Sequence, residues 1–131
     1  MTTEFAVWES PQPPSDAELD RIMAGVMGWE HKISESLFPA NPGTEVGVDS
    51  RGLFVMFPIQ WHPSTDVTQA MRCLKKVHDE GAYVSLDWLP SRPFAIGVRK
   101  ASRLPWGEGV GEPARAICLA IYKALKEVEN G

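Results

Sequence analysis

Apolar residues recur at helical spacing in three separate segments of the chain. In the middle segment the apolar positions are Val67, Ala70, Met71, Leu74 and Val77. One buried face at this spacing predicts a helix over residues 65–80. Ser64 or Thr65 is expected to supply its N-cap oxygen, and Asp66 places a carboxylate in the first turn. Gly81 allows the left-handed conformation that ends such a helix.

A second helix precedes this one and a third closes the chain. Ser15 and Glu18 form a capping-box pattern that opens the first helix, which Gly28 ends. Pro113 suits the first position of the last helix. The apolar positions are Leu19, Ile22, Met23 and Val26 in the first helix, and Ile117, Ala120, Ile121, Ala124, Leu125 and Val128 in the last. Each helix therefore has one face to bury.

Between the helices the pattern changes to that of strands. Residues 45–57 are rich in β-branched and aromatic residues on both sides of a turn at 49–52, which predicts a hairpin. Residues 82–89 and 94–100 predict a second hairpin. In its first strand Val84, Leu86 and Trp88 share one face, while Tyr83, Ser85 and Asp87 share the other, less buried face. The glycines and proline of 101–112 predict a mobile loop, and residues 30–37 give no clear assignment.

The elements run helix, hairpin, helix, hairpin, helix. This order predicts an α+β domain of three helices and about four mainly antiparallel strands in two hairpins. Two successive helix-plus-hairpin units suggest a structural pseudo-repeat. We expect the single domain to span residues 15–131. Residues 1–14 carry three prolines and predict an extended N-terminal arm. Its aromatic residues are expected to dock on the domain or on a second copy of it, and a frayed terminus is the alternative.

Composition narrows the class of protein. With 131 residues, 44% of them apolar, the chain is long enough to build one hydrophobic core. A net charge of -4 provides no basic surface for extended DNA or RNA, so we expect neither as a partner. Cys73 and Cys118 fall on apolar helix positions and are expected to be buried thiols. With no signal peptide and no apolar run of membrane length, we expect a cytoplasmic protein with no membrane partner.

Several short motifs add a family resemblance that spans about residues 16–128. The motifs are Val26-Met27-Gly28-Trp29, Pro63-Ser64-Thr65-Asp66 with the helix after it, Tyr83 to Trp88, and Pro113 to Ala120. In this order and spacing they resemble the phage ABA sandwich domain, a group of small phage proteins. The resemblance implies a layered α-β-α sandwich and a phage or prophage origin, and it implies no reaction. The chain departs from the pattern in its N-terminal arm, in Arg115 where an acidic residue is expected, and in a longer loop at 102–112.

Three further patterns are candidates for chemistry, and each also has a structural explanation. His62 and Asp66 stand one turn apart like an acid–base pair, although a surface histidine and a first-turn carboxylate explain them better. The three histidines lack the spacing of a metal site, so we expect no metal, no other cofactor and no catalytic residue. The glycine-rich segment 107–111 precedes a helix N-terminus, where a phosphate can bind, or else it is a plain flexible loop.

A group of basic and aromatic residues on the second hairpin and the loop after it is the strongest candidate for binding. Arginine binds phosphate in a bidentate manner and tryptophan stacks on bases, so a small nucleotide-like ligand suits this group. A solvated hairpin of ordinary charge is the alternative. The predicted ligand-binding residues are Arg92, Arg99, Lys100, Arg103 and Trp106, together with Trp88 and Asp87.

These observations leave three functions open. The first is a non-enzymatic phage accessory protein that binds a small nucleotide-like signal molecule and withholds it from host defence. The second is a protein-interaction module that inhibits a host defence protein by direct binding. The third is a nucleotide hydrolase that uses His62 or Asp66. Under each of them the five tryptophans, the apolar arm and the open strand edges favour a homodimer or a higher homo-oligomer.

Overall fold

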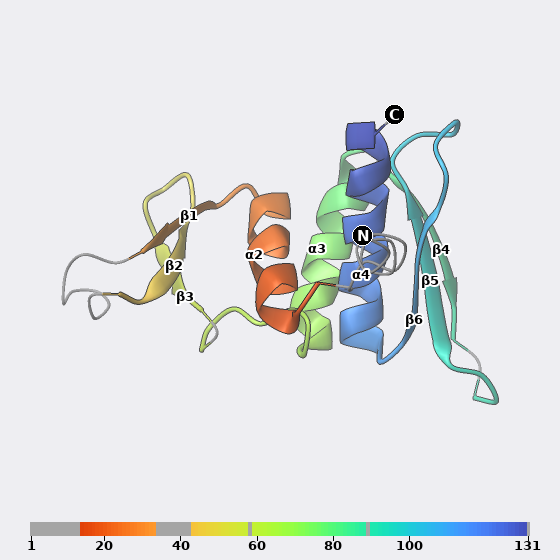
Figure 1. Cartoon of the computed structure of the whole chain (residues 1–131), viewed down its shortest axis with the longest axis horizontal. Helices are drawn as coiled ribbons and strands as arrows, with labels where there is room; N and C mark the ends of the chain where they lie inside the picture. The colour runs from red at the N-terminus through yellow and green to blue at the C-terminus, as the bar shows by residue number, and fades with distance from the viewer. Residues whose placement is uncertain (1–13, 34–42, 58, 89, 131) are drawn as a thin grey trace, which may run out of the picture.

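The structure, a computed structural model, describes residues 14–33, 43–57, 59–88 and 90–130. Its elements are α2 (Asp16–Val26), β1 (Glu30–Ile33), β2 (Glu45–Val48), β3 (Phe54–Met56), α3 (Val67–Asp79), β4 (Tyr83–Asp87), β5 (Phe94–Arg99), β6 (Gly107–Gly111) and α4 (Pro113–Asn130). Strands β1, β2 and β3 form one antiparallel sheet, and β4, β5 and β6 form a second. The helices lie between the two sheets (Figure 1).

The predicted α+β class, with three helices and antiparallel strands, is confirmed for the described residues. The described residues form six strands rather than about four, because each predicted hairpin gains a third strand. A unit of one helix followed by a three-stranded meander therefore occurs twice. The layers run sheet, helices, sheet, which differs from the α-β-α order that the resemblance implied. The helices take the middle because the second sheet has only one strongly apolar face, formed by β5 side chains such as Ile96 and Val98.

Strand β6 corrects the prediction of a mobile loop over 101–112. Residues 107–111 pair with β5 and lie directly on α4. A Cβ atom at Gly109 would overlap the carbonyl group of Ala116, and one at Gly107 would stand 2.5 Å from the carbonyl oxygen of Ala120. The glycines are therefore required for close packing of strand on helix, and conformational freedom is not their role.

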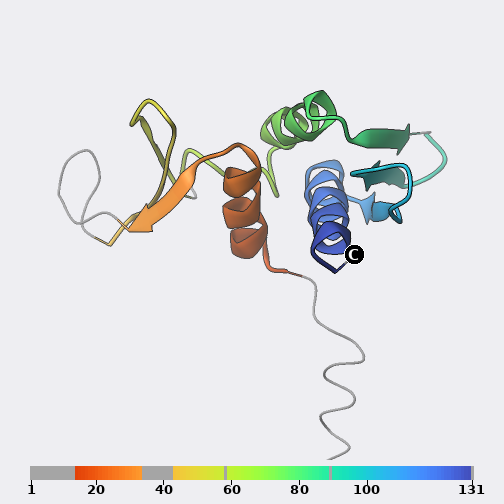
Figure 2. The ribbon, with the colours of Figure 1, turned by 90° about the horizontal axis from the view of Figure 1, so that it is seen from above.

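Helix α4 lies at the centre of the molecule, between α2 and the second sheet (Figure 2). Its side chains Ile117 and Ile121 are buried among residues from α2, α3 and β5. Cys73 and Cys118 are buried free thiols, as predicted. Burial raises the pKa of the Cys73 thiol to about 12, so this group stays protonated and unreactive at neutral pH.

The helix caps follow the sequence closely, with one exception. The Ser15 hydroxyl accepts from the Glu18 backbone and the Glu18 carboxylate accepts from the Ser15 backbone, which confirms the capping box. The N-cap of α3 is Asp66, whose carboxylate accepts from the Gln69 N–H at 3.1 Å, so the prediction of Ser64 or Thr65 was wrong. Ser64 lies before the helix start and is held by Asp20, because its backbone N–H donates to the buried Asp20 carboxylate at 2.9 Å.

The predicted arm of residues 1–14 lies outside the described residues except for Pro14. Pro14 is buried, and its carbonyl accepts a hydrogen bond from Arg115 Nη2 at 2.7 Å. Arg115 also forms an ion pair with Asp16, which ties the start of α4 to the start of α2. This contact accounts for the unexpected arginine. Across the described ranges, no helix combines the length and the apolar character that crossing a membrane requires.

Candidate ligand-binding site

A cation and two aromatic rings form a stack on the outer face of the second sheet, the face turned away from α4. The guanidinium carbon of Arg99 lies 4.5 Å from the centre of the Trp106 ring and 5.1 Å from that of the Tyr83 ring. Tyr83 stands directly opposite Arg99 in the pairing of β4 with β5. An arginine over an aromatic face is attracted by the negative potential of the ring. Arg99 therefore fixes the orientation of Trp106.

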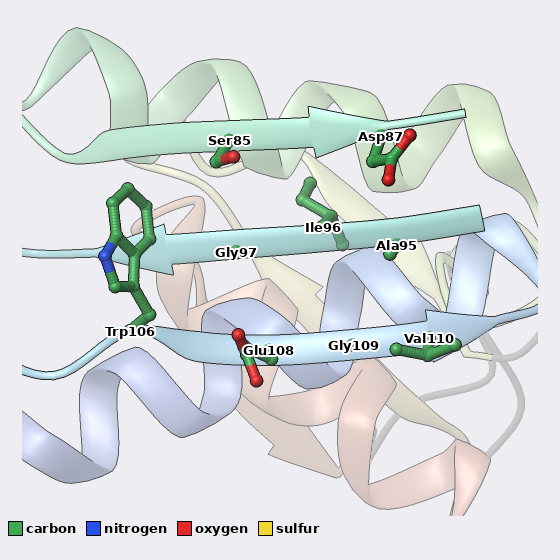
Figure 3. Close-up of a pocket in the computed structure, with 9 residues that line it drawn as sticks. All are labelled: Ser85, Asp87, Ala95, Ile96, Gly97, Trp106, Glu108, Gly109 and Val110. Carbon is green, nitrogen blue, oxygen red and sulfur yellow. The ribbon is translucent and has the colours of Figure 1, made fainter. Parts of the chain in front are cut away.

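A hollow of about 360 Å³ lies beside this stack (Figure 3). Ala95 and Gly97 of β5 leave the middle of the face almost without side chains, and Trp106 stands at one end. The Trp106 ring rests on the strand, since a Cβ atom at Gly97 would lie 3.0 Å from it. The hollow is lined by Ser85, Asp87, Ala95, Ile96, Gly97, Trp106, Glu108, Gly109 and Val110. Trp106 thus contacts Arg99 and also lines the hollow, whereas Arg99 itself is not among the lining residues.

The charged side chains of the hollow are two carboxylates, which accept hydrogen bonds. Asp87 comes from β4 and Glu108 from β6, so the two carboxylates face the hollow from opposite sides, with the Ser85 hydroxyl between Asp87 and Trp106 (Figure 3). The nearest described cation to Asp87 is Arg92, at 3.8 Å in a loose and exposed ion pair. The hollow therefore favours a flat ligand that has N–H donors at its edges.

The structure brings together four of the seven predicted ligand-binding residues. Asp87 and Trp106 line the hollow, Arg99 stacks behind Trp106, and Arg92 stands at the Asp87 end. Trp88 belongs to the opposite face by strand alternation and packs edge-on against Phe94, with ring centres 5.3 Å apart. Lys100 lines a different cavity beside Val77 and Leu125, and Arg103 lies on the exposed turn after β5. The predicted basic group is thus divided between two sides of the sheet.

The prediction did not include Tyr83, Ser85, Glu108 and the small residues Ala95 and Gly97. The alternation in β4 already placed Tyr83 and Ser85 on the face of Asp87, and that signal was available. Glu108 was missed because the segment that carries it was expected to be a loop. The signal for a strand at 107–111 was available in two patterns. Glycine occupies every second position of this segment, and the helix after it has alanines four residues apart.

The other candidate chemistries find structural explanations. The Asp66 carboxylate caps α3, and the His62 ring contacts the Thr65 hydroxyl at 3.3 Å. Residues 107–111 pair as a strand, so the segment does not form a loop around an anion. Within the part of the chain that the structure describes, no group of three or more His, Cys, Asp or Glu side chains could hold a metal ion.

Comparison with known proteins gives no further guidance. No family model, no curated protein and no solved structure matches the chain. The resemblance to the phage ABA sandwich domain remains a prediction from local motifs, and function has to be inferred from the geometry of the sheet face.

Proposed function

We propose that this protein is a non-enzymatic binding protein that holds a small nucleotide-like ligand on the outer face of its second sheet. The observation that carries the proposal is the position of Trp106. Arg99 packs over its ring at 4.5 Å, and the same tryptophan stands at one end of the hollow. A base that enters the hollow stacks on a ring whose orientation is already fixed, and little ordering entropy is lost on binding.

The carboxylates select the kind of base. Asp87 and Glu108 accept hydrogen bonds, so they favour bases with amino and ring N–H donors over bases whose edges are mainly carbonyl oxygens. Guanine has a ring N–H next to an amino group and fits one carboxylate in a bidentate manner. Uracil would place carbonyl oxygens against the carboxylates. We therefore expect guanine nucleotides to bind more tightly than uridine nucleotides.

The phosphate would lie outside the hollow, because its charge is repelled by Asp87 and Glu108. Arg92 stands at the Asp87 end with a side chain that is 66% exposed, and it forms only a loose pair at 3.8 Å. An exposed arginine of this kind remains free to bind a phosphate. A long nucleic acid has many phosphates and gains little from a single arginine, which favours a small ligand.

Sequestration is the role that fits a binding site without reactive groups. Among the described residues that line the hollow, Ser85 has no histidine or lysine beside it, and the carboxylates of Asp87 and Glu108 are weak bases for a serine hydroxyl. The hydrolase alternative loses support because Asp66 serves as a helix cap. The resemblance to small phage proteins suggests that the ligand is a host signal molecule and that its removal counters defence.

Fluorescence titration with guanosine 5′-monophosphate tests this function. Stacking of a base on an aromatic side chain contributes about 1–3 kcal/mol, so Trp106→Leu should weaken binding by roughly tenfold to a hundredfold. Trp88→Leu is the matched control, because Trp88 is also exposed but lies on the other face of the sheet. Ala95→Leu should fill the floor of the hollow and abolish binding while leaving the fold intact.

The result that would contradict the proposal is equal affinity of the Trp106→Leu and Trp88→Leu variants. Chromatography of the nucleotide after incubation separates binding from catalysis. Unchanged nucleotide supports sequestration, whereas turnover that survives repurification means that the protein is an enzyme.

A second candidate function is direct inhibition of a host defence protein through the first sheet. This sheet and the segment after it expose Ile33, Leu53, Phe54 and Ile59, with 74% of the Ile59 side chain accessible. The sheet projects from one end of the molecule, away from the hollow (Figure 1). Exposed apolar side chains of this size often mark a protein contact. Recovery of a stoichiometric host protein that is lost with Leu53→Lys and kept with Trp106→Leu would favour this function.

A further inference from the structure

The second sheet has two edges, and they differ in how they are protected. At the β6 edge, the Lys123 ammonium donates to the carbonyl of Glu108 at 3.0 Å. Strand β4 forms the other edge, and among the described residues no strand pairs with its outer side. Its sequence Tyr-Val-Ser-Leu-Asp contains no lysine, proline or glycine. Proteins usually protect an edge strand with such residues, because unpaired backbone groups attract another strand.

Apolar side chains accumulate on this same side of the molecule. Arg72 of α3 lies over Trp61, and Lys76 lines a cavity with Ile22, so that flank of α3 faces α2. Val67 and Met71 lie on the other flank, by helical spacing. Strand β4 runs in the direction opposite to α3 after the turn at 80–82 and adds two more apolar residues (Figure 1). The exposed fractions are 43% for Val67, 45% for Met71, 47% for Leu86 and 64% for Trp88.

We propose that a second copy of this chain covers the β4 edge, with the two β4 strands paired antiparallel about a two-fold axis at Ser85. Only pairings that keep outer side chains on the outer face are consistent with the buried and exposed faces of the sheet. The pairing centred on Ser85 is the one that overlaps all five residues of the strand. It places Val84 opposite Leu86 of the partner subunit, so apolar side chains meet on the inner face.

The same pairing is complementary in charge on the outer face. Tyr83 stands opposite Asp87 of the partner subunit, and Arg99 follows Tyr83 in the same cross-strand row. The Arg99 guanidinium already lies over the Tyr83 ring at 5.1 Å. Its Nε atom is buried and has no hydrogen-bond partner among the described residues. A carboxylate brought to this row supplies an opposite charge next to a cation that lacks an ion pair among the described residues.

Pairing at β4 joins two three-stranded sheets into one continuous sheet of six strands. The two hollows then lie on the same outer face, on either side of the Ser85 pair. This assembly does not depend on the ligand, so its test is independent of the proposed function.

Light scattering coupled to gel filtration tests the assembly with two matched variants. Leu86→Lys places a charge on the apolar side of the β4 edge and should convert the dimer to a monomer. Val110→Lys makes the same change on β6, where the side chain is 64% exposed, and should leave a dimer. Thermal unfolding of each variant confirms that it is folded. A wild-type protein that runs as a monomer, or a Leu86→Lys variant that remains a dimer, would overturn the proposal.

A cysteine cross-link tests the register. Residues directly opposite each other in antiparallel strands have Cβ atoms about 4.5–5.5 Å apart, close enough for a disulfide to form after a small adjustment. Ser85→Cys should therefore yield a covalent dimer on oxidation. Tyr83→Cys should not, because position 83 faces position 87 of the partner. The native thiols do not interfere, since Cys73 and Cys118 are buried. Cross-linking of Tyr83→Cys in place of Ser85→Cys would mean a different pairing.

Discussion

Arg99 acts on the ligand through Trp106. Its guanidinium packs over the Tyr83 and Trp106 rings and does not line the hollow, so its role differs from the direct phosphate contact that the sequence suggested. Removing it would leave Trp106 without support on one face while the hollow keeps its lining residues. The role assigned to Arg99 is therefore that of a positioning residue.

Replacing Arg99 by glutamine should weaken guanosine monophosphate binding less than Trp106→Leu does. The Trp106 ring remains in the variant, but its orientation is no longer fixed. The side chain then loses conformational entropy when the ligand binds. The Trp106 emission spectrum should shift in the absence of ligand, because the indole loses a neighbouring charge. An affinity loss as large as that of Trp106→Leu, with no spectral shift, would mean that Arg99 contacts the ligand itself.

Asp20 provides a second test at this scale, through the pH dependence of stability. Burial raises the pKa of Asp20 above its ordinary value of 3.8, and the hydrogen bond from Ser64 opposes the shift only in part. The folded chain therefore keeps this proton to a higher pH than the unfolded chain. It follows that the Asp20 contribution to the free energy of unfolding decreases as the pH rises from about 3.8 through the raised pKa of the folded state.

An Asp20→Asn variant should lose this pH dependence. Its amide oxygen still accepts from the Ser64 N–H, and no charge is buried. Urea unfolding at a series of pH values should show that the variant gains stability relative to wild type as the pH rises through this window. Asp20→Leu leaves the Ser64 N–H without an acceptor and should be less stable than the Asn variant by about 1–3 kcal/mol at every pH. A difference between wild type and Asn variant that is constant with pH would contradict the assignment.

At the scale of elements, the glycines of β6 decide whether the sheet packs on α4. Gly109→Ala should lower the free energy of unfolding by about 3 kcal/mol, because its Cβ meets the backbone of Ala116, which has no room to move aside. Gly25→Ala is the matched control. Gly25 is exposed in α2 with nothing within 4 Å of an added Cβ, so alanine there should stabilise by about 1 kcal/mol. Urea unfolding measures both, and equal small effects would mean that β6 is held loosely.

The sequence predicted the elements that have a strong local signal. The capping box at Ser15, the stop at Gly81 and the two faces of β4 depend on neighbouring residues only. Strands β1 and β6 depend on distant partners, and local pattern could not reveal them. Residues 30–33 pair with 45–48 across a long connection, and the glycines of β6 have meaning only against the alanines of α4. The site was predicted only in part for the same reason. The local pattern of β4 predicted Asp87, whereas Glu108 could be predicted only once β6 was recognised as a strand.

At the scale of the whole molecule, the two sheets have different roles. The second sheet packs tightly on α4 through β5 and β6, and it offers a hollow on its other face. The first sheet is joined to the rest mainly through α2, including the bidentate pair of Arg21 with Glu45 at 2.9–3.0 Å. A rigid second sheet suits a binding face, because a ligand then meets preorganised groups.

Backbone amide NMR during titration with guanosine monophosphate shows whether the outer face of the second sheet binds a nucleotide. Chemical shift changes are expected at Ser85, Gly97 and Glu108 and at the indole N–H of Trp106. Little change is expected at Lys100 and Leu125, which line the cavity on the helix side of the sheet. Chemical shift changes confined to that cavity would contradict nucleotide binding on the outer face. The absence of any shift change at millimolar guanosine monophosphate would contradict it as well.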